Sequence, residues 1–134
     1  MPLKYLLDTQ VLIYIGCGTA EKIGRKALRA YRDIESDIYI SQISFWELAI
    51  KINIGKLTIP IGLKNVMILA KDAGITMLPV DNAHILQFES LKLHEQHKDP
   101  FDRFIVAVAL SEKMHILGDD AKFDLYKGVR RIWN

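Results

Sequence analysis

The chain has 134 residues, half of them hydrophobic and a quarter charged, a length and composition that fit one globular domain, residues 1–134, and exclude a disordered chain. No apolar run approaches the roughly 20 residues that span a bilayer, so we expect no membrane contact. The start MPLKYLLDTQ lacks a secretory signal pattern. Cys17 is the only cysteine, which excludes an internal disulfide, and we therefore expect a cytoplasmic protein. The net charge of +2 permits nucleic-acid binding but does not argue for it.

Apolar runs and their stop signals predict strands that alternate with helices along the chain. The predicted strands cover residues 3–7, 37–41, 75–80, 115–118 and 129–133. The predicted helices cover residues 9–16, 21–35, 42–54, about 62–73, about 82–92 and about 100–114, with a short helical turn near Phe123. This alternation implies right-handed crossovers and an α/β fold with a mostly parallel sheet covered on both faces.

The acidic residues stand close to the ends of the predicted strands. In parallel sheets of this kind, ligands bind beyond the carboxyl ends of the strands. Most of the acids could therefore gather at one edge of the sheet. Those directly after a strand are Asp8, Asp81, Asp119 and Asp120, while Glu47, Asp99 and Asp102 lie in the first turns of a helix or just ahead of one.

Helix capping is the simplest explanation for each acid taken alone. A side-chain oxygen at a helix start accepts hydrogen bonds from the free amides of the first turn. The candidates for this role are Asp8, Asp81 and Asp99. Ser44 and Glu47 also have the spacing of a capping box, in which Glu47 would bond back to the backbone of Ser44.

Capping does not explain why several helix starts should meet at one sheet edge. Bringing carboxylates such as Asp8, Glu47 and Asp120 together is costly unless a cation neutralises them. Mg²⁺ or Mn²⁺ suits a pocket of oxygen ligands without His or Cys, and the four histidines of the chain show no spacing that predicts a site. A divalent ion can activate water and hold a phosphate for attack.

Five segments of the chain, in the right order, resemble the PIN-domain ribonucleases of the VapC toxin type, in particular a subgroup that contains DPFDR. They are LLDTQVLIY, ISQISFWELAIKINIGKL, MLPVDNAHI, HKDPFDRFIVAVAL and LGDDAKFDLY. The resemblance implies a three-layer α/β/α sandwich and a toxin of a toxin–antitoxin pair that cleaves RNA with Mg²⁺ or Mn²⁺. It further implies a cognate antitoxin, a homodimer and an RNA substrate, of which transfer RNA is the first to consider.

Matching motif to motif, the resemblance assigns catalytic and metal-binding roles to four acids: Asp8, Glu47, Asp102 and Asp120. It places Asp99 at the rim of the pocket, as a helix cap or as a partner of a metal ligand. Two departures are Gln10, where the subgroup often has His, and Gly118, where Thr or Ser is common. Whether Asp119 or Asp120 faces the site stays open, and Arg103 could balance the acids, contact phosphate or form a surface salt bridge.

Other functions remain compatible with parts of the sequence. A catalytically degenerate PIN domain that binds RNA or protein is the main alternative, although it would be expected to have lost some of the four acids. A nuclease for DNA is also open, since no residue is seen to read a 2′-hydroxyl. A phosphotransferase of the haloacid dehalogenase type needs a second Asp where Gln10 stands, and a response-regulator receiver needs an acid pair after its first strand.

Overall fold

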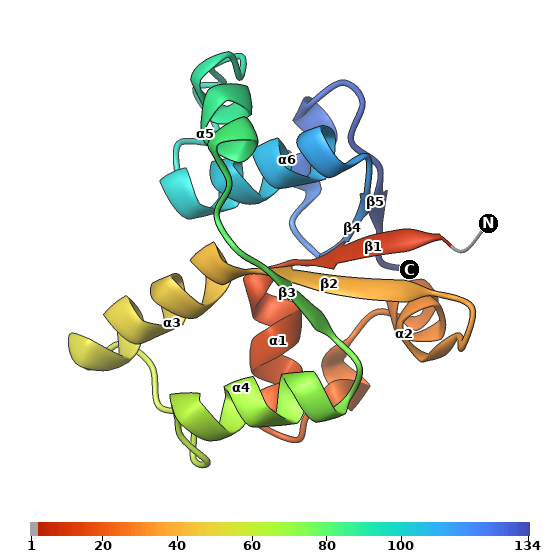
Figure 1. Cartoon of the computed structure of the whole chain (residues 1–134), viewed down its shortest axis with the longest axis vertical. Helices are drawn as coiled ribbons and strands as arrows, with labels where there is room; N and C mark the ends of the chain where they lie inside the picture. Colours follow the sequence, from red (N-terminus) through yellow and green to blue (C-terminus); the bar gives the residue numbers. More distant parts are fainter. Residues whose placement is uncertain (1–2) are drawn as a thin grey trace.

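Five short strands, each parallel to its neighbours, form the central sheet of the computed structural model, which describes residues 3–134 (Figure 1). They are β1 (Lys4–Leu7), β2 (Asp37–Ser41), β3 (Thr76–Leu78), β4 (His115–Leu117) and β5 (Arg131–Ile132), in the spatial order β3-β2-β1-β4-β5. The prediction of an α/β fold around a parallel sheet is confirmed, with each strand close to its expected place.

The helices are α1 (Thr9–Gly16), α2 (Arg25–Arg32), α3 (Gln42–Asn53), α4 (Leu63–Asp72), α5 (Asn82–Glu89) and α6 (Pro100–Glu112), with short 3₁₀ segments η1 (Ala20–Lys22) and η2 (Ala121–Leu125). The single helix predicted for residues 21–35 was wrong, because Gly24 is extended and separates η1 from α2. A Cβ atom at Gly24 would lie 2.5 Å from the carbonyl oxygen of Trp133, so this close approach requires glycine. None of the helices within residues 3–134 is long and apolar enough to cross a membrane.

The hydrophobic core has two parts, one on each face of the sheet. In β1, Leu6 points to one face while Tyr5 and Leu7 point to the other, as the period-two alternation of a strand requires. The Tyr5 and Leu7 face packs against α1, α2, α3 and α4, and the Leu6 face packs against α6 and η2. Burial on both faces explains why residues 5–7 of β1 are continuously apolar, whereas Lys4 at its start is exposed.

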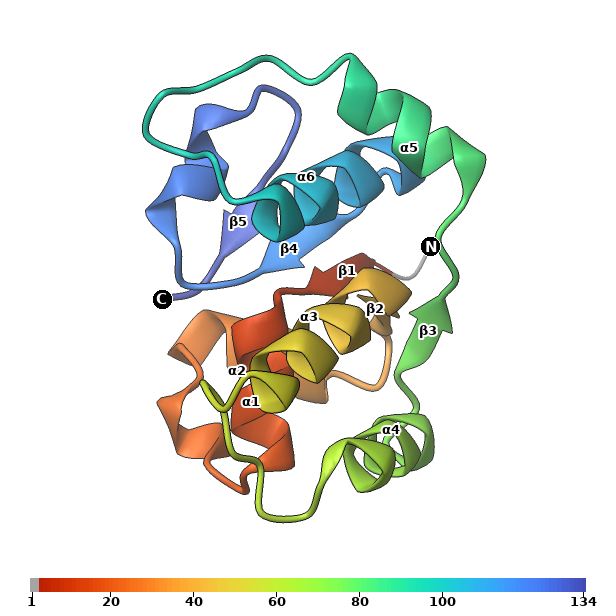
Figure 2. The ribbon, with the colours of Figure 1, turned by 90° about the vertical axis from the view of Figure 1, so that its left-hand side faces the viewer.

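The order of the strands places a crevice at the carboxyl end of β1. From β1 the chain adds β2 and then β3 on one side, after which α5 and α6 cross the other face and return the chain to β4, beside β1 (Figure 2). The connections that leave β1 and β4 therefore diverge, and ligands of open α/β sheets bind at such a switch point. Asp8 follows β1 there, and residues 118–120 follow β4.

Candidate metal centre

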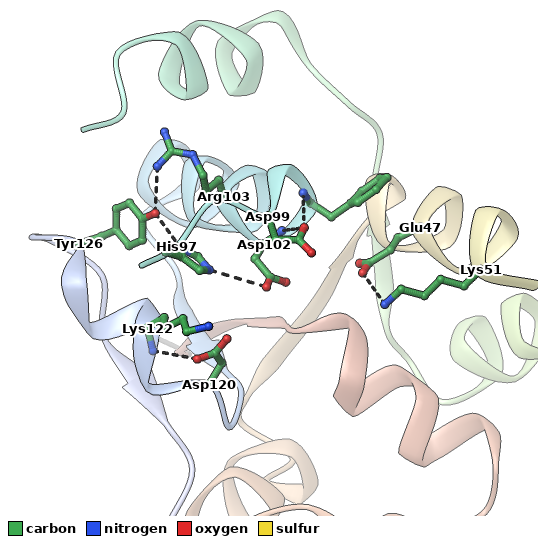
Figure 3. A network of polar contacts seen from close by, with 10 residues as sticks. Glu47, Lys51, His97, Asp99, Asp102, Arg103, Asp120, Lys122 and Tyr126 are labelled. Atoms are coloured by element: carbon green, nitrogen blue, oxygen red, sulfur yellow. Dashed lines mark hydrogen bonds and ion pairs between the residues drawn. The ribbon is translucent and has the colours of Figure 1, made fainter. Parts of the chain in front are cut away.

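A pocket of about 390 Å³ opens at the switch point, between α1, α3, α6 and the start of η2 (Figure 3). All four acids that the resemblance assigned to the site line it, together with Asp99 and Asp119. The full lining is Asp8, Thr9, Gln10, Ile13, Tyr14, Glu47, Lys51, Asp99, Asp102, Asp119 and Asp120. The structure thus brings together acids from four separate parts of the chain, as the positions of the strand ends indicated.

Asp8 is the most confined of these acids. Its backbone N–H donates to Leu117 O at 3.0 Å, which continues the pairing of β1 with β4 and fixes the residue at the floor of the pocket. Its side chain is 8% exposed and makes no capping hydrogen bond to the amides of Thr9–Gly16. Burial and the neighbouring charge of Asp102 raise the pKa of Asp8 from its ordinary value of 3.8 to about 7.

The neighbours of Asp8 are packed tightly against it. A Cβ atom on Gly118 would lie 3.0 Å from Asp8 Cβ, so the hydroxyl side chain common at this position in the resembled family would crowd the carboxylate. Thr9, which follows Asp8, is buried and donates through Oγ1 to Ser44 Oγ at 2.9 Å. This bond ties the start of α1 to α3, the helix that carries the next acid of the pocket.

Glu47 projects from α3 and is 4% exposed. One of its oxygens, Oε2, lies 2.9 Å from Lys51 Nζ, one helical turn further on, while Oε1 is fully buried without a hydrogen-bond partner in residues 3–134. The capping box predicted from Ser44 and Glu47 was wrong, because α3 begins earlier and its cap is Ser41, whose side chain accepts from Ile43 N. Glu47 is therefore free to face the pocket.

Asp99 and Asp102 lie at the start of α6 but have different surroundings. Asp99 is exposed and caps the helix, since its Oδ1 accepts from the amides of Phe101 at 2.8 Å and Asp102 at 3.3 Å. Asp102 points into the pocket (Figure 3). Burial, followed by the charges of Asp99 and Glu47, raises its pKa to about 7.

Asp120 is the member of the adjacent pair that lies closest to the other acids. Its Oδ1 accepts from Lys122 N at 2.9 Å, which caps η2, and a carboxylate oxygen lies within 4.8 Å of ligand atoms on Asp102 and His97. Asp119 is exposed at the pocket mouth, where its backbone oxygen accepts from Arg131. The geometry favours Asp120 as the inward acid.

The residues present fit a divalent cation. Two carboxylates have pKa values near 7 because they are buried and lie close to other acids, and Oε1 of Glu47 has no hydrogen-bond partner within residues 3–134. Lys51 compensates part of this charge: burial lowers its pKa, but the hydrogen bond and charge of Glu47 outweigh that effect and raise it. An oxygen-liganded ion would supply the missing positive charge.

Three residues of the site were missed or misjudged from the sequence: His97, Arg103 and Tyr126. Arg103 neither balances the acids nor lies on the surface. It is 5% exposed, and its Nη1 donates to Tyr126 Oη at 3.0 Å and to Lys92 O at 3.1 Å. Tyr126 Oη in turn lies 2.7 Å from Nδ1 of His97, whose ring is 2% exposed beside the pocket.

A larger hollow lies elsewhere on the surface and has a different chemistry. It measures about 600 Å³, lies between β3 and α4, and is lined mainly by apolar side chains such as Phe45, Met67 and Met77. Lys71 is its charged lining residue, and no carboxylate lines it among residues 3–134. The chemistry that the acids can support therefore belongs to the smaller pocket.

Together, the parallel sheet and the acid pocket at its switch point define an α/β protein with a candidate site for a divalent cation. The sequence model of the PIN domain matches residues 5–129, and the chain belongs to the PIN domain family. No curated protein matches the chain.

Two of the solved structures that share the fold come from Rickettsia felis and Neisseria gonorrhoeae. VapBC2 from Rickettsia felis, solved bound to a DNA fragment from its promoter, is similar with a TM-score of 0.66 and 14% identity over 98% of this chain and 100% of that one. FitAcB from Neisseria gonorrhoeae has a TM-score of 0.62 and 20% identity over 96% of each chain. The expectation of a PIN-type fold is confirmed, while assignment to the DPFDR subgroup stays a prediction.

Proposed function

We propose that this PIN domain is a ribonuclease that hydrolyses RNA phosphodiester bonds with Mg²⁺ or Mn²⁺ and acts as the toxin of a toxin–antitoxin pair. The observation that carries the proposal is the convergence of Asp8, Glu47, Asp102 and Asp120 on one pocket. Two of these carboxyls have pKa values raised to about 7. Such an arrangement opposes folding unless a cation offsets it, so its value to the protein lies in binding.

The four acids would hold the ion together. Asp8, which follows β1, is close enough to Asp102 of α6 for their charges to interact, and Glu47 and Asp120 line the same pocket. When bound, a divalent ion lowers the pKa of a water molecule and offsets the charge of a phosphate. The chain contributes the fixed positions of these oxygens, because each acid is held by a strand end or a helix start.

Among residues 3–134, Lys51 is the basic residue that lines this pocket. Its ammonium pairs with Glu47, and its side chain is 43% exposed, so it can also reach the phosphate of an entering strand. Binding through such basic groups would weaken with added salt. This supports a polyanionic substrate, for which RNA is the proposed class and transfer RNA the first candidate.

The proposed biological role rests on the similarity of this fold to solved structures of other proteins. The solved structures that share this fold include VapBC2 and FitAcB, and the first of these was solved with promoter DNA. By analogy, we propose that this chain is inhibited by a cognate antitoxin, that it forms a homodimer and that it acts in the cytoplasm. A small DNA-binding protein encoded beside it should copurify with the chain and suppress cleavage.

RNA cleavage by the purified chain tests the proposal. End-labelled transfer RNA and single-stranded DNA of the same sequence are incubated with Mg²⁺, with Mn²⁺ or with EDTA. The wild type should cleave RNA only with metal, and Asp102→Asn should lose at least about 100-fold in rate because one charged oxygen ligand is gone. Asp72→Asn, an exposed change on α4, is the matched control and should cleave normally.

Three results would contradict the proposal. Equal cleavage in EDTA, or by Asp102→Asn, would point to a contaminating nuclease. Equal cleavage of DNA would remove the specificity for RNA. Tight RNA binding without any cleavage would favour a degenerate PIN domain that acts as a binding module.

A further inference from the structure

The segment 97–103, HKDPFDR, supplies more to the pocket than its two acids. In residues 3–134, two fully buried side-chain polar atoms lack a hydrogen-bond partner, Glu47 Oε1 and His97 Nε2. Both belong to side chains beside the acid pocket. His97 Nε2 lies 3.7 Å from Asp102 Oδ2 (Figure 3), so the buried imidazole is directed at the carboxylate on which the proposed function depends.

Arg103 and Tyr126 determine which nitrogen of His97 carries the proton. A guanidinium can only donate, so Tyr126 Oη accepts from Arg103 Nη1. The single proton of the Tyr126 hydroxyl then has His97 Nδ1, at 2.7 Å, as its close acceptor. Since Nδ1 accepts, the proton of the imidazole is on Nε2, and an N–H group faces Asp102.

The opposite tautomer fits the contacts less well. If His97 Nδ1 donated to Tyr126, the hydroxyl oxygen would accept from both His97 and Arg103, and the buried hydroxyl proton would have no acceptor among the contacts in residues 3–134. Nε2 would then present a lone pair to the carboxylates of Asp102 and Asp120, which is electrostatically unfavourable.

The ring of His97 is held firmly enough to position another group. Its edge packs against Phe123 and Tyr126, with ring centroids 5.8 and 5.5 Å away. The loop before it is fixed by Arg103, whose Nη1 and Nη2 donate to the carbonyls of Lys92 and Leu91. Arg103 therefore connects the loop, the tyrosine and the imidazole on one side of the pocket.

We propose that His97 is a positioning residue, held by Arg103 and Tyr126 so that its Nε2–H faces Asp102 Oδ2 at 3.7 Å and orients this carboxylate toward a divalent ion by electrostatic attraction. The inference rests on the proposed function, because it assigns His97 a role in the same pocket. An Nε2 that carries a proton does not coordinate a metal, so the ion keeps an all-oxygen ligand set, which suits Mg²⁺ and Mn²⁺. Partners that orient a ligand typically change metal affinity by about 10- to 100-fold when removed.

Long-range ¹H–¹⁵N NMR of the histidine rings tests the tautomer in the wild-type chain. The signals of His97, assigned by their loss in His97→Gln, should show a protonated Nε2 and an unprotonated Nδ1, both without metal and with saturating Mg²⁺. Tyr126→Phe should abolish this preference. A proton on Nδ1, or loss of the Nε2 proton when Mg²⁺ binds, would overturn the proposal.

Mn²⁺ affinity, measured by EPR titration, tests the effect on Asp102. The side-chain amide of Gln can place an N–H near the position of Nε2, whereas that of Asn reaches only the position of Nδ1. His97→Asn should therefore weaken Mn²⁺ binding about 10-fold, while His97→Gln should stay within about threefold of the wild type. His115→Asn is the control, because His115 lies at the start of β4 and is not among the residues that line the acid pocket.

The two proposals fail in different ways. If Asp102→Asn loses Mn²⁺ binding while His97→Asn binds like the wild type, the role of His97 is refuted and the metal site stands. If Asp102→Asn binds Mn²⁺ normally, the proposed function itself is refuted. If His97→Asn and His97→Gln weaken Mn²⁺ binding equally, the imidazole acts by packing and not by presenting an N–H group to Asp102.

Discussion

The starts of helices α1 and α5 look alike in the sequence, but the aspartate that precedes each helix has a different role. Each helix follows an aspartate with extended backbone, Asp8 with φ −68° and ψ 151° and Asp81 with φ −113° and ψ 151°. Asp81 accepts from Ala83 N at 2.9 Å, and the side chain of His84 accepts from Asp81 N, which completes a capping box. Asp8 makes no side-chain cap hydrogen bond at the start of α1 and is buried among other acids.

This difference separates an acid that stabilises the fold from one that opposes it. Asp81 is exposed and satisfies a helix amide, so its charge costs little and its hydrogen bond contributes stability. Asp8 loses hydration, lies near Asp102, Glu47 and Asp120, and has a raised pKa. A residue kept where it destabilises the chain indicates binding or catalysis.

The largest expected effect is on activity at Asp8. Asp8→Asn keeps the shape of the side chain but removes its charge, so metal-dependent RNA cleavage should fall at least about 100-fold. The metal-free chain should become more stable, because a buried charge is gone. Cleavage assays and urea unfolding in EDTA check the two effects together. A variant that is both inactive and less stable would place Asp8 among the structural acids.

The next largest expected effect is a pH dependence of the free energy of unfolding of the metal-free chain. In the folded state the pKa values of Asp8 and Asp102 are about 7, above the ordinary 3.8, so the native state binds more protons than the unfolded state between about pH 4 and 7. The free energy of unfolding should therefore fall as pH rises through this window, by at most about 1.4 kcal/mol per pH unit for each carboxyl.

Urea titrations in EDTA from pH 4.5 to 8 measure this slope. Asp102→Asn removes one of the two titrating carboxyls and leaves the charged neighbours Glu47, Asp99, Asp120 and Lys51 in the sequence, so this variant should have a shallower slope. Asp81→Asn should keep the slope of the wild type. Identical slopes in wild type and Asp102→Asn would show that the pocket does not hold the extra protons.

A smaller effect should follow from adding metal. An ion that binds only the folded state stabilises it by about 2.7 kcal/mol when its concentration is 100 times the dissociation constant, which corresponds to a rise in Tm of roughly 10 °C. The wild type and Asp81→Asn should shift equally, whereas Asp8→Asn should shift far less. Differential scanning calorimetry with and without Mn²⁺ checks this, and an equal shift in Asp8→Asn would place the ion elsewhere.

The two helix starts also show what the sequence could predict. Alternating strands and helices place Asp8 and Asp120 at strand ends, and the parallel-sheet rule brings such ends to one edge. The pattern of strands and helices did not distinguish the capping Asp81 from Asp8, because both follow a strand and precede a helix; the resemblance to the PIN family assigned only Asp8 to the site. The strand order, in which β4 returns beside β1, gives the physical reason for this difference.

Contacts between distant residues were beyond the sequence patterns. Arg103 and Tyr126 are 23 residues apart and His97 and Tyr126 are 29 apart, and no spacing rule connects side chains across such separations. His97 stands in a polar loop, where a single histidine has no periodic neighbours. Ser44 was taken for a cap because the true cap, Ser41, is also the last residue of β2.

The smallest expected effect is on stability, at Asp81, the aspartate that caps α5. Asp81→Ala removes the acceptor for Ala83 N and should lower the free energy of unfolding by about 1 kcal/mol. Asp81→Asn keeps an acceptor and should lose only a few tenths of this, since Asn caps helices about as well as Asp. Both variants should bind Mn²⁺ and cleave RNA like the wild type, because Asp81 is not among the residues that line the acid pocket. A loss of Mn²⁺ affinity in Asp81→Ala would mean that the α5 start and the pocket are coupled, and the division between capping and binding acids would not hold.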